Sequence, residues 1–397
     1  MSPIMLVVGT RPEGIKMMPV YYALKRAALP VIICSTGQHN HLLQEVFDMF
    51  GVVPDITLSL MRPDQTISYL TTAVLTQMEI IYQQYQPALV LVQGDTTTVM
   101  AAALAAYYQK IPVGHVEAGL RTGDLFRPYP EEANRCIVGV LAQYHFAPTA
   151  YATGVLLGEG KSRESVFCVG NTVVDALHDV IKKIEQKELS VSEQLTDLVA
   201  NADARGLKKI LLTVHRRESF GAGLTSILSA VISFAKKHPD TLIFYPRHPN
   251  PAITETLAEL GMHEQKNIKI FEPLAYHELV FLLKSVDCVM TDSGGIQEEA
   301  VSLGKPVLVL REKTERMEAI WEGCAQLIGM HQETICTMLE QHLFGTNSKE
   351  KKESSIYGDG HAGERIVEIL KTVVLEKGRS MLYDHSKVMP MEKRMRV

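Results

Sequence analysis

Residues 4–16 read IMLVVGTRPEGIK, and this stretch decides the fold. Its apolar start, rich in β-branched side chains, predicts a buried strand over Ile4–Val8 that ends at a glycine. From Lys16 to Ala27 the apolar residues recur at helical spacing. A buried strand, a short charged loop and an amphipathic helix in succession indicate one unit of a parallel sheet that is covered by helices.

The same alternation continues along the chain in two blocks. In the first block, further strands are predicted at Val31–Cys34, Leu89–Val92, Val113–Val116, His145–Ala147 and Val166–Val169, and helices at Leu42–Phe50, Thr66–Tyr85 and Thr97–Tyr108. After a charged helical connector at Asp175–Ala204, the second block has predicted strands at Lys209–Thr213, Thr241–Tyr245, Ile268–Phe271, Cys288–Thr291 and Val307–Leu310. We therefore expect two doubly wound α/β domains, residues 1–170 and 171–360, with ligands in the cleft at the carboxyl ends of their strands.

The end of the chain and its composition narrow the class of protein further. A last helix is predicted at about 361–375, and residues 376–397 are predicted to be a flexible tail. The length of 397 residues favours two cores over one, and a net charge of −5 argues against a nucleic-acid partner. Six cysteines without CxxC spacing argue against a zinc site, so no metal is expected. With neither a secretory signal nor an apolar run of about 18 residues, we expect a cytoplasmic protein without membrane contact.

The loop after the first strand carries two basic residues. Arg11 and Lys16 lie where free amide groups and the helix dipole favour an anion, and a pyrophosphate would suit the site. The alternative is a turn whose basic side chains face solvent. The loop has neither the GxGxxG nor the Walker A pattern, which argues against dinucleotide binding and ATP hydrolysis.

Three acidic residues stand at or near the ends of the N-terminal strands. Asp95 lies in GDTTT, Glu117 in HVEAGLRTGD and Glu131 in PYPEEANR. Each has a structural alternative, as a helix cap or an ordinary strand-end residue. Acids and bases gathered at one edge of a sheet can separate their pKa values and transfer protons. The basic residues of this predicted group are Arg11, Lys16, Arg121 and Arg135.

The second block supplies a predicted phosphate site. ILLTVHRRESFG places His215 in a charged cluster that is costly unless an anion binds there, so we expect His215 to contact phosphate. In CVMTDSGGIQEEA, the backbone of residues 293–295 can approach a phosphate at a helix N-terminus, and Glu299 can accept hydrogen bonds from ribose hydroxyls. Arg316, after the last predicted strand, is placed to meet the same phosphate.

Taken in order, the motifs GTRPE, GDTTT, GHVEAGLRTGD, PEEANR, HRRES, TDSGGIQEEA and TER resemble those of the non-hydrolysing UDP-N-acetylglucosamine 2-epimerases. The resemblance covers most of the chain, from GTRPEGIK to YGDGHAGERI. It implies two Rossmann-like domains similar to B-type glycosyltransferases, with an interdomain cleft and the last helix returning to the N-terminal domain. It also implies a reaction without a cofactor that serves surface polysaccharide synthesis. UDP leaves as the C2 proton is removed, and it adds back to a 2-acetamidoglucal that is reprotonated from the other face.

The resemblance also implies roles for the candidate residues. Asp95, Glu117 and Glu131 would be the acid and base groups, and His215 would assist at UDP. The resemblance leaves open which carboxylate takes which proton. The remaining substrate-binding residues would be Arg11, Lys16, Arg135, Pro273, Tyr276, Ser293, Gly294, Gly295, Glu299 and Arg316, with uracil against the backbone of 273–276.

Several positions depart from the family pattern, and other functions share its motifs. The departures are at Gly14, Val214, Arg247 and Met317. Gln38, Glu131, Arg216 and His248 match a pocket in which many bacterial members bind a second, activating UDP-GlcNAc, whereas His41 and Asp64 do not. We expect a homodimer. The alternatives are a hydrolysing 2-epimerase, an epimerase of another 2-acetamido UDP-sugar, a UDP-dependent glycosyltransferase and a non-catalytic UDP-sugar sensor.

Overall fold

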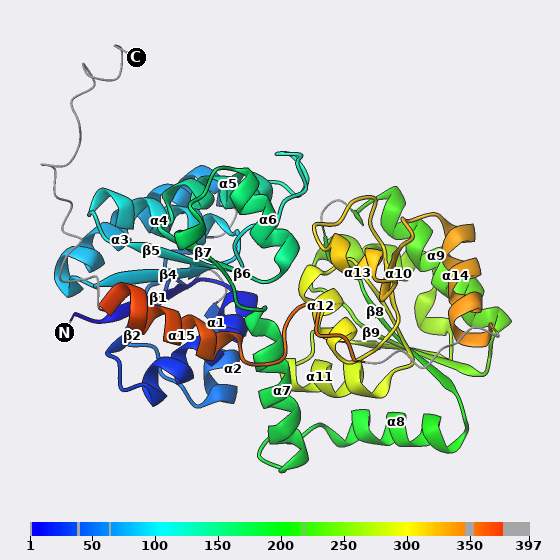
Figure 1. The fold of residues 1–397 in the computed structure, drawn as a ribbon. Coiled ribbons are helices and arrows are strands. Elements are labelled where there is room, and N and C mark those ends of the chain that lie inside the picture. Colours follow the sequence, from blue (N-terminus) through cyan, green and yellow to red (C-terminus); the bar gives the residue numbers. More distant parts are fainter. Residues whose placement is uncertain (1, 38–39, 63–64, 217–218, 346–352, 376–397) are drawn as a thin grey trace, which may run out of the picture.

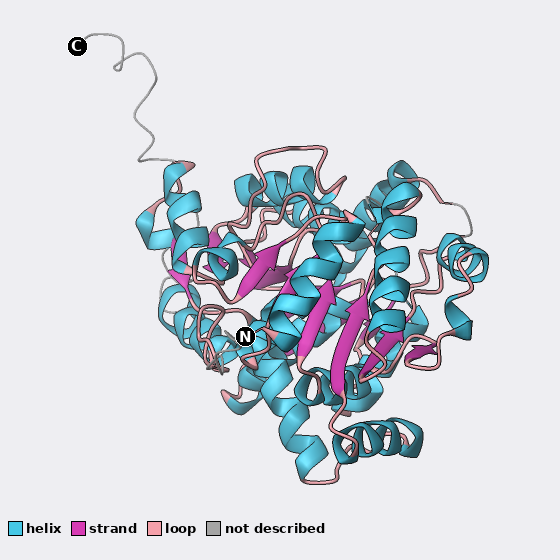
Figure 2. Ribbon diagram, turned by 90° about the vertical axis from the view of Figure 1, so that its right-hand side faces the viewer, coloured by secondary structure: helices cyan, strands magenta, loops and turns pink. Residues whose placement is uncertain are grey.

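The computed structural model describes residues 2–37, 40–62, 65–216, 219–345 and 353–375. They form two parallel sheets with helices on both faces of each sheet (Figure 1, Figure 2). This arrangement confirms the predicted α/β class with two Rossmann-like units. Among the described residues, none of the helices combines the length and the apolar character needed to cross a membrane.

The N-terminal half is built around a seven-stranded sheet in the order β3-β2-β1-β4-β5-β6-β7. The strands are β1 Ile4–Val8, β2 Val31–Ser35, β3 Ile56–Thr57, β4 Leu89–Gln93, β5 Val113–Val116, β6 Tyr144–Ala147 and β7 Val166–Cys168. The helices are α1 Arg11–Arg26, α2 Asn40–Phe50, α3 Ile67–Tyr85, α4 Thr97–Tyr108, α5 Glu131–Leu141 and α6 Ala150–Gly158. The strand order reverses between β1 and β4, which is where ligands bind in such sheets.

The C-terminal half repeats this order in a six-stranded sheet, β10-β9-β8-β11-β12-β13, which reverses between β8 and β11. Its strands are β8 Lys208–Thr213, β9 Thr241–Pro246, β10 Ile268–Phe271, β11 Cys288–Thr291, β12 Val307–Val309 and β13 Ala325–Leu327. Its helices are α8 Glu193–Ala204, α9 Ala222–Lys237, α10 Pro251–Glu259, α11 Tyr276–Ser285, α12 Gly294–Ser302, α13 Met317–Trp321 and α14 Gln332–Phe344.

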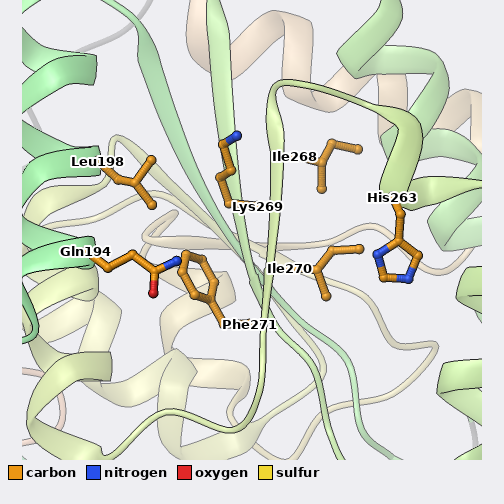
Figure 3. Close-up of a pocket in the computed structure, with 7 residues that line it drawn as sticks. All are labelled: Gln194, Leu198, His263, Ile268, Lys269, Ile270 and Phe271. Atoms are coloured by element: carbon orange, nitrogen blue, oxygen red, sulfur yellow. The ribbon is translucent and has the colours of Figure 1, made fainter.

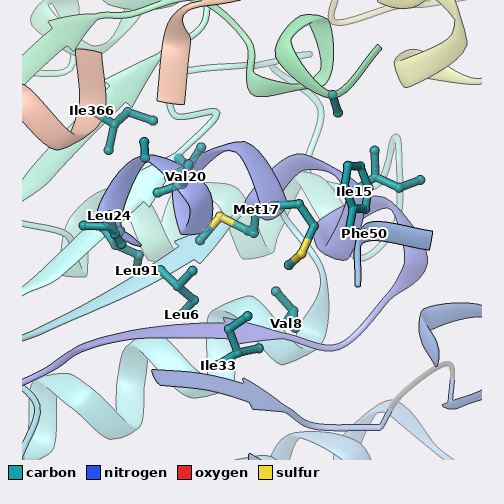
Figure 4. Close-up of a cluster of buried hydrophobic side chains, with 14 of the residues drawn as sticks. Leu6, Val8, Ile15, Met17, Val20, Leu24, Ile33, Phe50, Leu91 and Ile366 are labelled. Atoms are coloured by element: carbon teal, nitrogen blue, oxygen red, sulfur yellow. The ribbon is translucent and has the colours of Figure 1, made fainter. Parts of the chain in front are cut away.

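The chain crosses between the halves twice, side by side. Helix α7 (Thr172–Glu185) follows the first crossing, and α15 (Ala362–Ile369) follows the second and continues as a π-helical turn over Leu370–Leu375. At the crossing itself, the backbone N–H of Asn171 donates to the carbonyl of Tyr357 at 2.6 Å. Helix α15 then lies across α1 of the N-terminal half (Figure 1), and Ile366 joins Leu6, Met17 and Phe50 in one core (Figure 4).

Side chains also join the halves away from these crossings. Thr149, at the start of α6, donates its hydroxyl to the buried carboxylate of Glu318 in α13. On the same two helices, the rings of Tyr151 and Trp321 meet edge to face with centroids 4.9 Å apart. Because α6 belongs to the first half and α13 to the second, these pairs hold the two halves together.

The predicted elements differ from the observed ones mainly at their ends. Helix α1 begins at Arg11 and not at Lys16, because Pro12 fits the first turn of a helix, where no backbone donor is needed. Strands β3 and β13, of two and three residues, were not predicted. Such short edge strands carry too few residues for an alternating pattern. The predicted tail, residues 376–397, lies outside the described residues.

Candidate functional site

The candidate residues lie on loops at the reversal points of both sheets. Arg11 begins the helix that follows β1, and Asp95 lies on the loop after β4. The loops after β8 and β11 carry His215 and Ser293. Because ligands of such sheets bind where the strand order reverses, both halves offer their principal binding edge to the site.

Glu117 is the most heavily bonded of the predicted acids. It follows β5 in a left-handed conformation, with φ of 67°, which costs a residue other than glycine roughly 1 kcal/mol or more. Its carboxylate accepts hydrogen bonds from Lys16, from Gln93 at 2.6 Å and from Arg316 at 3.0 Å. The bond to Arg316 joins the two halves, so Glu117 is fixed by donors from both.

Asp95 lies directly after β4 and pairs with Arg135 of α5. Burial alone would raise the pKa of the Asp95 carboxyl, but the Arg135 guanidinium outweighs burial and holds that pKa below its usual value. Asn134 also donates to the Asp95 carbonyl at 2.9 Å, which ties the loop to the same helix. Asp95 is therefore ionised at neutral pH.

Glu131, the first residue of α5, has its pKa displaced in the opposite direction from that of Asp95. Burial, followed by the negative charge of Asp95, raises the pKa of its carboxyl. The neighbouring Glu132 is structural, since it accepts bonds from the backbone N–H groups of Thr122 and Gly123 at 2.9 and 3.0 Å and from Arg135 at 3.1 Å. Asp95 and Glu131 thus have pKa values displaced in opposite directions, as acid and base groups of one site require.

Arg316 is held by three carboxylates. Its guanidinium donates to Glu298 at 3.1 Å and to Glu117 and Glu315. It also occupies the space above Gly294, where an added Cβ would lie 2.5 Å from the Arg316 Cζ. Burial raises the pKa of Glu298 to about 7 against the opposing charges of Arg316 and Lys16.

The predicted nucleotide residues of the second half are also bonded to one another. The Tyr276 hydroxyl donates to the Glu299 carboxylate at 2.5 Å, and burial raises the pKa of Glu299 to about 7. Arg11 of the first half donates to the carbonyl of Leu274 at 2.9 Å. Pro273 is exposed, so the 273–276 segment has a face open to solvent and an anchored inner side.

His215 lies against two other residues of the second half. Its ring stacks on His248, with centroids 6.0 Å apart, and its Nδ1 is 3.3 Å from the Asp292 carboxylate. Burial lowers the pKa of His215, although Asp292 acts in the opposite direction. Arg216 points to Glu315 at 3.8 Å.

Known proteins resemble the chain along almost its whole length. Residues 22–371 match the family model described as UDP-N-acetylglucosamine 2-epimerase. The UDP-N-acetylglucosamine 2-epimerase of Salmonella typhimurium is 44% identical over 375 residues, covering 93% of this chain and 98% of the relative. The chain belongs to the UDP-N-acetylglucosamine 2-epimerase family.

Solved structures of this 2-epimerase family share the fold. The UDP-GlcNAc 2-epimerase of Neisseria meningitidis, bound to UDP-GlcNAc, has a TM-score of 0.87 and 39% identity, covering 93% of this chain and all of the other. The Methanocaldococcus jannaschii enzyme, in complex with UDP-GlcNAc and UDP, has a TM-score of 0.81 and 34% identity, covering 93% of this chain and 99% of the other.

The structure of this 2-epimerase family member brings most of the predicted residues together and adds others. Arg216 and His248 lie beside His215, whereas Gln38, Arg217 and Glu218 fall outside the described residues. Sequence reasoning did not select Asp292, Glu298 and Glu315 as site residues. The available signal was that each lies next to a selected residue, in TDSGG, QEE and TER.

Two hollows elsewhere on the molecule do not belong to this charged region. They have volumes of about 210 and 270 Å³ and flank the edge strand β10, with His263, Ile270 and Phe271 common to both. Figure 3 shows Lys269 and Phe271 on one side of the strand and Ile268 and Ile270 on the other.

Within the described ranges, no three His, Cys, Asp or Glu side chains are grouped in a way that could hold a metal ion.

Proposed function

We propose that the chain interconverts UDP-N-acetylglucosamine and UDP-N-acetylmannosamine by inverting C2, without net hydrolysis. The observation that carries the proposal is the pair Asp95 and Glu131, two carboxyl groups whose pKa values are displaced in opposite directions at the edge of one sheet. Related proteins named for this activity, one of them with UDP-GlcNAc bound, support the choice of substrate.

The proposed chemistry is an elimination followed by the reverse addition. A carboxylate takes the C2 proton, the C1–O bond breaks with its electron pair leaving on UDP, and a C1–C2 double bond forms in a 2-acetamidoglucal. A proton then adds to the other face of C2 as UDP returns to C1. Because every electron pair stays within sugar and UDP, the reaction needs no oxidant or reductant. Removing a weakly acidic proton needs a base held beside it, and the diphosphate needs cations.

The surroundings of each acid favour different tasks. An ionised Asp95 suits proton removal, whereas Glu131, with its raised pKa, can hold the proton that returns. Glu117 would orient the sugar ring or accept a proton once ligand has displaced one of its cationic donors. His215, Arg316 and the backbone of 293–295 are proposed to hold the diphosphate.

The proposed substrate-binding residues come from both sheets. We therefore also propose that each sheet is the centre of one domain. The first domain comprises residues 1–170 with about 361–375, and the second comprises residues 171–360. Arg11, Lys16 and Arg135 would hold the sugar-phosphate from the first domain. Glu299 and the segment 273–276 would hold ribose and uracil from the second. A second, activating UDP-GlcNAc near Arg216 and His248 remains a proposal from the family resemblance.

The experiment that tests the function is incubation with UDP-GlcNAc in D2O, followed by NMR of the sugar. UDP-ManNAc with deuterium at C2 is the expected product. Free ManNAc would indicate the hydrolysing alternative, and exchange confined to another 2-acetamido UDP-sugar would change the substrate. If C2 keeps its proton in all of these sugars, the proposed reaction is wrong, and transfer to an acceptor or simple binding takes its place.

We propose in addition that the protein is a homodimer. Exposed apolar side chains lie on three helices that pack against one another in sequence, with Ile80 on α3, Tyr107 and Tyr108 on α4, and Ile137 and Val140 on α5. Exposed apolar side chains on adjoining elements of one domain are typical of an association surface, and a second copy of the chain could cover them.

A further inference from the structure

Asp292 is a completely buried acid at the reversal point of the C-terminal sheet. It follows β11 directly, its exposure is 0%, and its backbone N–H donates to the carbonyl of Thr213 at 3.3 Å. That bond continues the pairing of β11 with β8 beyond the last strand residue. The carboxylate is therefore fixed in the sheet, next to the loop that leaves β8.

Three residues that follow β8, His215, Arg216 and Ser219, donate hydrogen bonds to this one carboxylate. Asp292 accepts hydrogen bonds from the backbone N–H of His215 at 3.0 Å, from the backbone N–H of Arg216 at 2.9 Å and from the Ser219 hydroxyl at 3.0 Å. The Arg216 Nε donates to the Asp292 carbonyl at 3.0 Å. A carboxylate that accepts several such bonds is well stabilised as an anion.

The same carboxylate faces the His215 ring. The distance from Nδ1 of His215 to Oδ1 of Asp292 is 3.3 Å. Since an ionised carboxylate can only accept, the proton of a neutral His215 belongs on Nδ1, and Nε2 is the nitrogen left for a ligand. The His248 ring is stacked beside the same ring, at an interplanar angle of 19°.

We propose that Asp292 is a positioning residue for the reaction. It holds His215 with Nδ1–H directed at its own carboxylate, so that Nε2 meets the diphosphate of the UDP-sugar. The inference rests on the proposed function, in which His215 assists UDP. It adds the residue that fixes the orientation and the tautomer of that histidine.

Asp292 also counters the positive charges around His215. Arg216 in the same loop, His248 after β9 and Arg311 after β12 all oppose protonation of the ring, as does its burial, whereas Asp292 favours protonation. When the diphosphate approaches, His215 takes a proton from solvent on Nε2 and donates it in a hydrogen bond. The Asp292 carboxylate then faces the other side of the imidazolium and stabilises it.

The test compares Asp292→Asn with Ser219→Ala in the full-length protein. The asparagine amide would donate to Nδ1 and move the His215 proton to Nε2, whereas the serine variant loses one bond to the same carboxylate and leaves the ring alone. ¹⁵N NMR of histidine-labelled protein, with His215→Gln for assignment, should show Nδ1–H in wild type and in Ser219→Ala but Nε2–H in Asp292→Asn. We expect kcat of Asp292→Asn to fall roughly 10²-fold or more.

The same experiment separates this inference from the function on which it rests. A wild-type His215 with its proton on Nε2 would overturn the inference even if Asp292→Asn failed to fold. Equal losses of kcat in the two variants would reduce Asp292 to a structural role. If wild type binds UDP but does not convert UDP-GlcNAc, the proposed function fails, while the nitrogen shifts with and without UDP still decide the role of Asp292.

Discussion

At the residue scale, the pairing of Asp95 with Arg135 leads to a direct prediction. Asp95→Asn keeps the shape of the side chain and one acceptor for Arg135, but it removes the carboxylate that we propose as the base. We expect C2 deuterium exchange to fall by roughly 10²- to 10⁴-fold, the usual contribution of a general base, with UDP affinity little changed. NMR exchange and calorimetric titration with UDP measure the two quantities. Loss of UDP binding would remove Asp95 from the catalytic set.

Gly294 and Gly295 are adjacent glycines with different surroundings. A Cβ at Gly294 would lie 2.5 Å from the Arg316 guanidinium, whereas a Cβ at Gly295 would have no atom within 4 Å. Gly294→Ala should therefore displace Arg316 from its carboxylates and cost about 2 kcal/mol or more of unfolding free energy. Gly295→Ala should change that free energy by less than about 1 kcal/mol.

Urea unfolding and UDP titration of both variants check this prediction. Because a methyl group at position 295 would occupy the proposed path of the phosphate, Gly295→Ala should weaken UDP binding without destabilising the protein. Wild-type UDP affinity in Gly295→Ala would show that phosphate does not approach this residue.

Sequence alone pointed to the acids that stand at strand ends or a helix start, but it did not select the buried acids Asp292 and Glu298 beside them. Asp95, Glu117 and Glu131 stand at strand ends or a helix start, where topology limits their positions. Asp292 and Glu298 also follow or flank such points, but a sequence does not show which donors from distant loops will meet them. The four hydrogen-bond donors to Asp292, three to its carboxylate and one to its carbonyl, come from a segment more than 70 residues away.

At the element scale, α15 is anchored by its N-terminus. The Asp175 carboxylate of α7 accepts bonds from the backbone N–H groups of Ala362 and Gly363 at 3.2 and 2.8 Å, and burial raises the pKa of Asp175 to about 6. An added Cβ on Gly363 would lie 2.9 Å from the Pro19 backbone in α1. Only glycine therefore allows the two helices to approach this closely.

Gly363→Ala should consequently destabilise the protein by roughly 1 to 3 kcal/mol, because α15 must move away from α1. Gly154→Ala in α6 is the matched control, since it has open space around it and should stabilise the protein by up to about 1 kcal/mol. Thermal unfolding of the two variants gives the comparison. A stable Gly363→Ala protein would mean that α15 is not held by this contact.

The regular elements were predictable because their periodicity is local. Central strands such as β4 and β11 are buried on both faces and read as short, nearly continuous apolar runs, as strands of parallel sheets typically do. The docking of α15 on α1 was expected only from the family resemblance. Two contacts cause this docking, the cap from Asp175, which lies 188 residues before Gly363, and the close approach of Gly363 to Pro19, near the start of the chain.

At the scale of the whole molecule, buried histidines predict a loss of stability in acid. His115 on β5 is opposite His145 on β6, and burial lowers the pKa of His115 to about 4. In the unfolded chain this pKa is about 6.5. The contribution of neutral His115 to the free energy of unfolding is therefore fully present above pH 6.5 and is lost as the pH falls toward 4. At pH 5 the loss is about 2 kcal/mol.

The variant His115→Gln isolates this contribution, because glutamine does not titrate. Urea unfolding at pH 8 and pH 5 should show the wild type losing about 2 kcal/mol relative to the variant. The two proteins must be compared, because Glu13 and Glu299 add to the free energy of unfolding as the pH falls through part of the same range. Burial raises the pKa of each of these carboxyl groups to about 7. An identical pH dependence would contradict the prediction.

The proposed dimer face has a matched pair of test sites. Val140 on α5 lies within the face and is 74% exposed, while Val53, before β3, is 85% exposed and lies outside it. Val140→Glu should yield monomers in light scattering after size exclusion, because a charge would be buried against the second copy. Val53→Glu should leave the mass at twice that of the chain. Dimers of both variants would place the contact elsewhere.

The contact between Tyr151 and Trp321 gives the protein an intrinsic fluorescent probe. Trp321 is the one tryptophan among the 397 residues, and its ring touches a residue of the opposite half. All indole fluorescence of the protein therefore comes from a single point on the seam between the halves. Any ligand, salt or substitution that separates the two halves or draws them together at this contact can be followed by the wavelength of tryptophan emission. The measurement needs no added label and resolves changes within milliseconds.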